Sequence, residues 1–121
     1  DAINNEEELQ KFQLNLIDRF GPLPDATEEL LEIVRLRWLA QKLGMERIFL
    51  KSNNMTLYFI SDNSSLFYQS RTFQQILQNI QKYKNTCRMQ EKKNKLILTF
   101  ENITSVKKAL SQLTKLTVDT N

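Results

Sequence analysis

The sequence predicts an α+β fold, with an N-terminal helical hairpin followed by two β-hairpin-plus-helix units. Three observations support this fold class: apolar residues at helical spacing in the first 43 residues, two later pairs of short β-rich segments joined by polar turns, and a helical stripe after each pair. The predicted order is ααββαββα, with a four-stranded antiparallel sheet covered on one face by helices.

Length and composition suit a single domain over residues 1–121. The chain is 40% hydrophobic and 26% charged, and its two glycines and two prolines leave no room for flexible linkers. No apolar run approaches the roughly 20 residues of a membrane span, and no presequence is recognisable, so we expect a cytoplasmic protein. Because the first residue is Asp1 and the opening already resembles a helix start, we expect a piece of a longer protein.

The first element is predicted to be an amphipathic helix over about residues 5–20. Its apolar stripe consists of Leu9, Phe12, Leu16, Ile17 and Phe20, and the opposite, polar stripe consists of Glu8, Lys11, Asn15 and Asp18. A rigid corner follows, since Gly21 can adopt a positive φ and Pro22 and Pro24 cannot continue the helix. Four residues are interpreted as structural, burying the corner or breaking the helix: Phe20, Gly21, Leu23 and Pro24.

The second helix is predicted to run from the corner to about Leu43 and to end at Gly44, with a cap candidate at Pro24 or Asp25. Its apolar residues lie on more than one face, which is typical of a helix covered by several neighbours. Trp38 within it is interpreted as a core residue in preference to a binding anchor.

The remaining elements alternate between hairpins and helices. We expect strands over residues 47–51 and 55–60, a third helix over residues 70–83 capped by Ser70, strands over residues 86–92 and 95–100, and a fourth helix beginning near Ile103. The segment over residues 62–69 is predicted to be a polar loop. Cys87 is expected to be a buried hydrophobe.

Few residues are suited to catalysis or to a metal. The chain has no histidine, one cysteine and only the glycines Gly21 and Gly44, so it can form neither the usual metal sets nor a glycine-rich phosphate loop. Its carboxylates cluster in first helical turns, where they complement the helix dipole. We therefore expect no catalytic residue, no cofactor and no enzyme activity in this chain.

Nucleic-acid binding is the alternative hypothesis. After residue 61 the chain has ten lysines and arginines but only four acidic residues. To bind nucleic acid, the strand aromatics Phe49, Tyr58 and Phe59 would have to act as stacking platforms. The net charge of +3 is modest, and lysines at a hairpin turn, such as Lys92, Lys93 and Lys95, are commonly just hydrated. An interaction module that does not bind nucleic acid directly is the favoured interpretation.

Residues 18–50, DRFGPLPDATEELLEIVRLRWLAQKLGMERIFL, resemble the C-terminal (TRCF) domain of the bacterial transcription-repair coupling factors, a family of DNA translocases also called Mfd. The resemblance rests on three motifs: the DRFGxLP corner, LxxIxxLR at Leu30, Ile33, Leu36 and Arg37, and the break at Leu43 and Gly44. Up to about residue 116 the similarity is one of pattern alone.

This resemblance implies a regulatory function. The family's C-terminal domain packs on a UvrB-like module of its own chain, masks the UvrA-binding surface, and restrains the translocase until RNA polymerase is engaged. The resemblance also implies an intramolecular interface at the end of the first helix, with Asp18 as the strongest candidate residue and Arg19 beside it. Asn15 lies one turn earlier, where some relatives are expected to carry an acid, so a neutral hydrogen bond would replace one charge contact.

Overall fold

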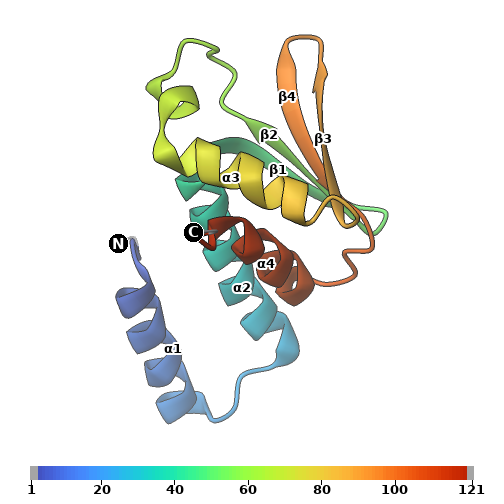
Figure 1. The fold of residues 1–121 in the computed structure, drawn as a ribbon. Helices are drawn as coiled ribbons and strands as arrows, with labels where there is room; N and C mark the ends of the chain where they lie inside the picture. Colours follow the sequence, from blue (N-terminus) through green and yellow to red (C-terminus); the bar gives the residue numbers. More distant parts are fainter. Residues whose placement is uncertain (1–2, 120–121) are drawn as a thin grey trace.

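The computed structural model describes residues 3–119 and confirms the predicted order of helices and strands (Figure 1). The α-helices are α1 (Glu6–Phe20), α2 (Asp25–Lys42), α3 (Arg71–Lys82) and α4 (Val106–Thr114), and the strands are β1 (Met45–Lys51), β2 (Asn54–Phe59), β3 (Cys87–Lys92) and β4 (Lys95–Phe100). Two 3-10 helices, η1 (Leu66–Gln69) and η2 (Lys115–Thr117), complete the fold. No helix in the described part of the chain is long and apolar enough to cross a membrane.

The sheet is antiparallel throughout, with the strand order β1-β2-β4-β3. The two hairpins therefore meet through their second strands, β2 and β4. Each hairpin turns on two residues with positive φ, Ser52 and Asn53 in the first (54° and 63°) and Lys93 and Asn94 in the second (53° and 64°). Two successive positive φ angles give the turn that matches the twist of a two-residue hairpin.

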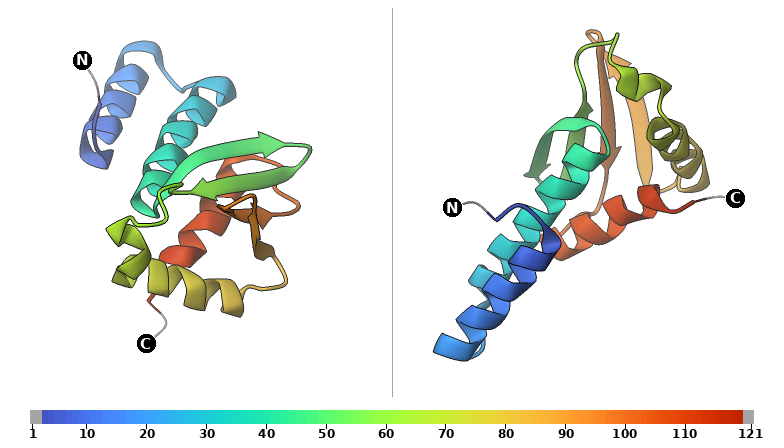
Figure 2. Two further views of the ribbon diagram at one scale, coloured as in Figure 1. Left: turned by 90° about the horizontal axis from the view of Figure 1, so that it is seen from above. Right: turned by 90° about the vertical axis from the view of Figure 1, so that its left-hand side faces the viewer.

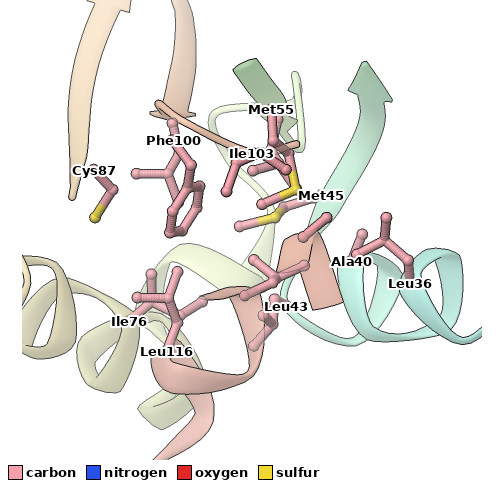
Figure 3. Packing of buried hydrophobic residues seen from close by; sticks show 14 of the residues in the cluster. Leu36, Ala40, Leu43, Met45, Met55, Ile76, Cys87, Phe100, Ile103 and Leu116 are labelled. Atoms are coloured by element: carbon pink, nitrogen blue, oxygen red, sulfur yellow. The ribbon is translucent and has the colours of Figure 1, made fainter. Parts of the chain in front are cut away.

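The main core lies between one face of the sheet and the helices (Figure 3). Every second residue of the central strands enters it, including Met55, Leu57 and Phe59 on β2 and Leu98 and Phe100 on β4. Cys87 is buried there, as predicted, and its burial raises the pKa of the thiol, which keeps it in the neutral form.

Helix α2 is in contact with several neighbours, as its scattered apolar residues predicted. It packs against α4 and β1, and Leu36 and Ala40 belong to the main core. Trp38, expected in the core, is only half-buried and lies outside this cluster.

Of the two cap candidates for α2, Pro24 occupies the N-cap, without a side-chain hydrogen bond, and Asp25 is the first helical residue. Two other local predictions were wrong. Ile103 is buried in the loop before α4, whose cap is Ser105. The loop over residues 62–69 contains η1, where Phe67 and Tyr68 join an aromatic cluster with Phe59 and Phe73. Local periodicity could not show this cluster, because its rings come from three separate elements.

The end of the chain is attached to α3 through a buried amide. Asn79, fully buried, donates hydrogen bonds to the carbonyl oxygens of Leu116 (2.9 Å) and Val118 (2.8 Å). Ser70 caps α3 as predicted, because its hydroxyl accepts a hydrogen bond from the backbone N–H of Phe73 (3.1 Å). Asn79 occupies a position that the helical stripe would assign to an apolar residue, so the sequence pattern did not reveal it.

Candidate functional site

The corner between α1 and α2 is the part of the molecule farthest from the sheet. Helix α1 runs alongside α2, and the two helices project from the body as a hairpin (Figure 1 and the right view of Figure 2). Residues at the corner can therefore contact another protein segment without any rearrangement of the core.

Arg35 of α2 is the polar link that holds α1 in place. Its Nε atom donates to both carboxylate oxygens of Glu6 (2.9 and 3.1 Å), its Nη2 atom donates to Gln13 (3.3 Å), and its Nη1 atom donates to Glu32 (2.8 Å). The hydrogen bond from Arg35, followed by its charge, holds the pKa of Glu6 below the usual range of a glutamate despite the opposing effect of burial. The buried residue Leu9 supplies the apolar part of the α1 packing.

Helix α1 ends at Gly21, which has a positive φ as predicted. Gly21 has a φ of 82° and a ψ of −168°, an extended conformation with positive φ, and its N–H donates to the carbonyl oxygen of Ile17 (2.8 Å). Leu23 is half-buried and Pro24 forms the N-cap of α2.

Phe20 does not bury the corner, and that interpretation was wrong. Its side chain is 75% exposed in the last turn of α1. The rest of the apolar stripe is also only partly covered, with Phe12 and Ile17 still exposed. A helix that packs on one neighbour buries a narrower stripe than a helix within a core.

Asp18 lies in the last turn of α1 with its side chain exposed. No hydrogen-bond or ion-pair partner of Asp18 is found among residues 3–119. The C-terminal end of a helix carries partial negative charge, so a carboxylate there is slightly unfavourable for stability. The fold therefore gains nothing from this acid.

Asn15 and Arg19 are exposed as well and lie beside Asp18 on the helix surface. At about 100° per residue, the order around α1 is Leu14, Asp18, Asn15 and Arg19, so the three predicted residues form one continuous band. We call this band, with Leu14 included, the corner surface.

Leu14 is the residue that the sequence analysis missed. Its side chain is 64% exposed on the polar side of α1, one turn before Asp18. The available signal was its position outside the apolar stripe, since a leucine among charged residues on an exposed helix face has no packing role. The corner surface thus combines one carboxylate, one amide, one guanidinium and one apolar side chain.

The described residues form no metal-binding cluster. Within residues 3–119 no group of three His, Cys, Asp or Glu side chains is arranged to hold a metal ion. The geometry at the corner, with exposed groups on a convex helix end, is suited to binding a protein surface and not to enclosing a small molecule.

The fold and the corner together define the class of protein: a small α+β domain with a helical hairpin that projects from a four-stranded sheet. The family model of the TRCF domain matches residues 1–70, more than half of the chain. The chain therefore belongs to the TRCF domain family, and the resemblance found in residues 18–50 is confirmed.

Curated relatives carry the name transcription-repair-coupling factor. That of Escherichia coli (strain K12) is 54% identical over 47 residues, which cover 39% of this chain and 4% of the relative. That of Haemophilus influenzae (strain ATCC 51907 / DSM 11121 / KW20 / Rd) is 49% identical over 47 residues, with the same shares of each chain. That of Buchnera aphidicola subsp. Baizongia pistaciae (strain Bp) is 28% identical over 82 residues, 68% of this chain and 11% of the relative. The chain thus spans only a small part of each relative's length.

A solved structure supports the fold. The crystal structure of the C-terminal domain of a transcription-repair coupling factor superposes with a TM-score of 0.70, covering 96% of this chain and 74% of that chain, at 23% sequence identity. At this identity the likeness establishes the architecture, including the α1–α2 hairpin.

Proposed function

We propose that this chain is a non-catalytic regulatory domain of a transcription-repair coupling DNA translocase. In the proposed resting state the corner surface packs on a UvrB-like module of the same polypeptide, masks its UvrA-binding site, and restrains activity until RNA polymerase is engaged. Family membership supports the nature of the parent protein. We also propose a cytoplasmic location, because all of these partners act on bacterial DNA.

The exposed, unpartnered carboxylate of Asp18 carries the proposal. A charged group that slightly destabilises its own helix and meets no partner within residues 3–119 is best explained by a partner outside them. An arginine of the UvrB-like module would form a charge-assisted hydrogen bond with it, and Asn15 would add a neutral one.

Leu14 supplies apolar area beside this charge. Interfaces commonly place a few apolar anchors next to hydrogen-bonded charges, so the three exposed residues Leu14, Asn15 and Asp18 form the proposed minimal contact. The small number of charges suits an inhibitory contact that must be released on demand.

A tethered contact of this kind can be weak and still effective. Within one chain the effective concentration of the partner surface reaches about millimolar for a short flexible connection. A coupling free energy of about 1–3 kcal/mol, typical of regulation between two sites, would then suffice to keep the resting state populated.

The test is Asp18→Lys in the full-length parent. Because the charge is reversed at the interface, we expect UvrA affinity to rise about 5- to 150-fold, the range that corresponds to such a coupling free energy, together with a higher basal rate of ATP hydrolysis. In the isolated domain the same change should leave the free energy of unfolding unchanged or raise it by about 0.3–1 kcal/mol, because a cation suits the C-terminal end of α1.

Glu91→Lys is the matched control. Glu91 is an exposed acid on β3, at the other end of the molecule, and its replacement makes the same change in net charge. UvrA affinity that stays constant in Asp18→Lys, or that rises equally in Glu91→Lys, would refute the autoinhibitory role of the corner surface.

A further inference from the structure

The face of the sheet that points away from the core is a second surface of note. In both figures α3 and α4 lie on one side of the sheet, and no helix of the described residues covers the other side (Figures 1 and 2). Strand register places two rows of residues across this side, Arg47–Tyr58–Ile97–Gln90 and Phe49–Thr56–Thr99–Arg88. We call these residues, with Lys51, Lys92 and Lys95 at the hairpin ends, the open face.

Two aromatic rings lie together on the open face. Phe49 and Tyr58 come from neighbouring strands and form an edge-to-face pair with their centroids 5.9 Å apart. Phe49 is 43% exposed, whereas Phe59, the residue after Tyr58, is buried in the core on the opposite face. The alternation of side chains along a strand thus separates the three strand aromatics into two accessible rings and one core ring.

Cations surround these rings. The guanidinium of Arg47 lies 5.1 Å from the centroid of Phe49, and the ammonium of Lys95 lies 5.8 Å from that of Tyr58. Both distances are within the range of a cation–π contact. Each ring is therefore flanked by a positive charge that could also reach a phosphate.

The charge on the open face is almost entirely of one sign. Register places five basic residues there, Arg47, Lys51, Arg88, Lys92 and Lys95. Among the described residues, Glu101 is the one acid that reaches this face, where it pairs with Arg88 (3.0 Å), while Glu46 at the bulge before Arg47 accepts hydrogen bonds from Ser61. Like charges gathered on one face repel one another, and a bound polyanion would remove that cost.

We propose that the open face is a docking site for single-stranded RNA. Bases would stack on Tyr58 and Phe49, and phosphates would be neutralised by the flanking Arg47 and Lys95, the combination by which antiparallel sheets bind single strands. Duplex RNA or DNA does not fit, since paired bases cannot offer their faces to rings on a sheet.

RNA is assigned in preference to DNA because of the neutral polar side chains on the same rows. Thr56 and Thr99 pair across the centre of the face, and Gln90 lies beside Ile97. Hydroxyl and amide groups can donate to and accept from a ribose 2′-hydroxyl, which DNA lacks. This binding site is independent of the corner surface, and it goes against the expectation from sequence that nucleic acid is not bound directly.

The test is fluorescence anisotropy of a labelled octauridylate with the 121-residue chain, titrated at several salt concentrations. We expect binding that weakens as salt rises, with a slope of about −0.7 per neutralised phosphate. Replacing either ring, by Phe49→Ala or Tyr58→Ala, should weaken binding about tenfold. The double variant Arg47→Gln/Lys95→Gln should flatten the salt slope by about 1.4.

Matched controls separate this site from general stickiness. Phe12 on α1 has the same 43% exposure as Phe49, so Phe12→Ala removes an equally exposed ring elsewhere. Lys107→Gln/Lys108→Gln removes two exposed cations from α4. Both controls should retain full affinity, and circular dichroism should show every variant folded.

Several results would overturn the proposal. These are no salt-dependent binding of octauridylate, an equal loss of affinity in the controls, or retention of affinity in folded Phe49→Ala and Tyr58→Ala variants. An octathymidylate or octadeoxyuridylate that binds as tightly as octauridylate would overturn the assignment to RNA.

Discussion

At the scale of single residues, Gly44 and Gly21 show how backbone conformation and side-chain packing each limit what the chain tolerates. Gly44 ends α2 with a φ of 76°, and a Cβ placed on it would collide with the ring of Phe67. That ring cannot move away easily, because Phe59, Phe73 and Tyr68 surround it. Gly21 has a similar φ of 82° but open space around its Cα.

This pair of glycines allows the two costs of a side chain to be measured separately. Gly21→Ala should lower the free energy of unfolding by about 1–3 kcal/mol, the cost of a side chain in an extended conformation with positive φ, which is essentially restricted to glycine. Gly44→Ala should lower it by a further 1–3 kcal/mol or so, because it also overpacks the aromatic cluster. Urea denaturation of both variants provides the comparison, and equal losses would show that Phe67 relaxes freely.

Asp18 and Phe20 illustrate the limits of local interpretation at the same scale. The sequence placed both at the end of α1, and the structure confirms that position. Whether each side chain is covered depends on the rest of the fold, which leaves Phe20 75% exposed. An apolar residue at a helix end can therefore stay exposed although it continues the buried stripe.

At the scale of elements, α1 differs from the rest of the fold. It contributes one buried residue, Leu9, among those described, and is linked to α2 mainly through Arg35. The other helices contribute to the main core on the sheet. Helix α1 should accordingly open before the others, since local stability follows buried apolar contact.

The pH dependence of α1 follows from Glu6. Its pKa is lower in the folded state than in the unfolded chain, so its ion pair with Arg35 stabilises α1 above about pH 4.3 and is lost as pH falls through the lower, folded value. Because the Glu6 side chain is half exposed, the effect should be below about 1 kcal/mol.

Hydrogen-exchange protection of α1 amides, relative to those of α3, measures this effect between pH 6 and pH 3. We expect α1 to lose protection on acidification and Glu6→Gln to abolish that change by removing the titrating group. Glu7→Gln, at an exposed neighbour, is the control. A response to acid that persists in Glu6→Gln would assign it to another carboxylate.

At the scale of the whole molecule, the corner surface and the open face lie at opposite ends (Figure 1). The main core between them is closely packed, and neither surface contributes a residue to the other. Perturbations at two distant sites without shared partners usually act independently.

We therefore predict that Asp18→Lys leaves the affinity for octauridylate within twofold of the starting protein. Conversely, Phe49→Ala in the full-length parent should leave UvrA affinity unchanged. Fluorescence anisotropy with octauridylate and a UvrA-binding assay, each applied to both variants, give the four affinities that this comparison needs. A change of more than about fivefold in either crossed measurement would mean that the two surfaces overlap or that one conformational change links them.

The sequence alone determined the order of the elements, the caps at Ser70 and the end of α2, both hairpins and the corner, because these depend on periodicity and on residues within one turn of each other. Only the tertiary structure decided which faces are covered. It exposed Leu14 and Phe20, put Phe59 inside and Phe49 with Tyr58 outside, and buried Asn79 against the end of the chain. Burial is a property of neighbours that are distant in sequence, and no local pattern contains them.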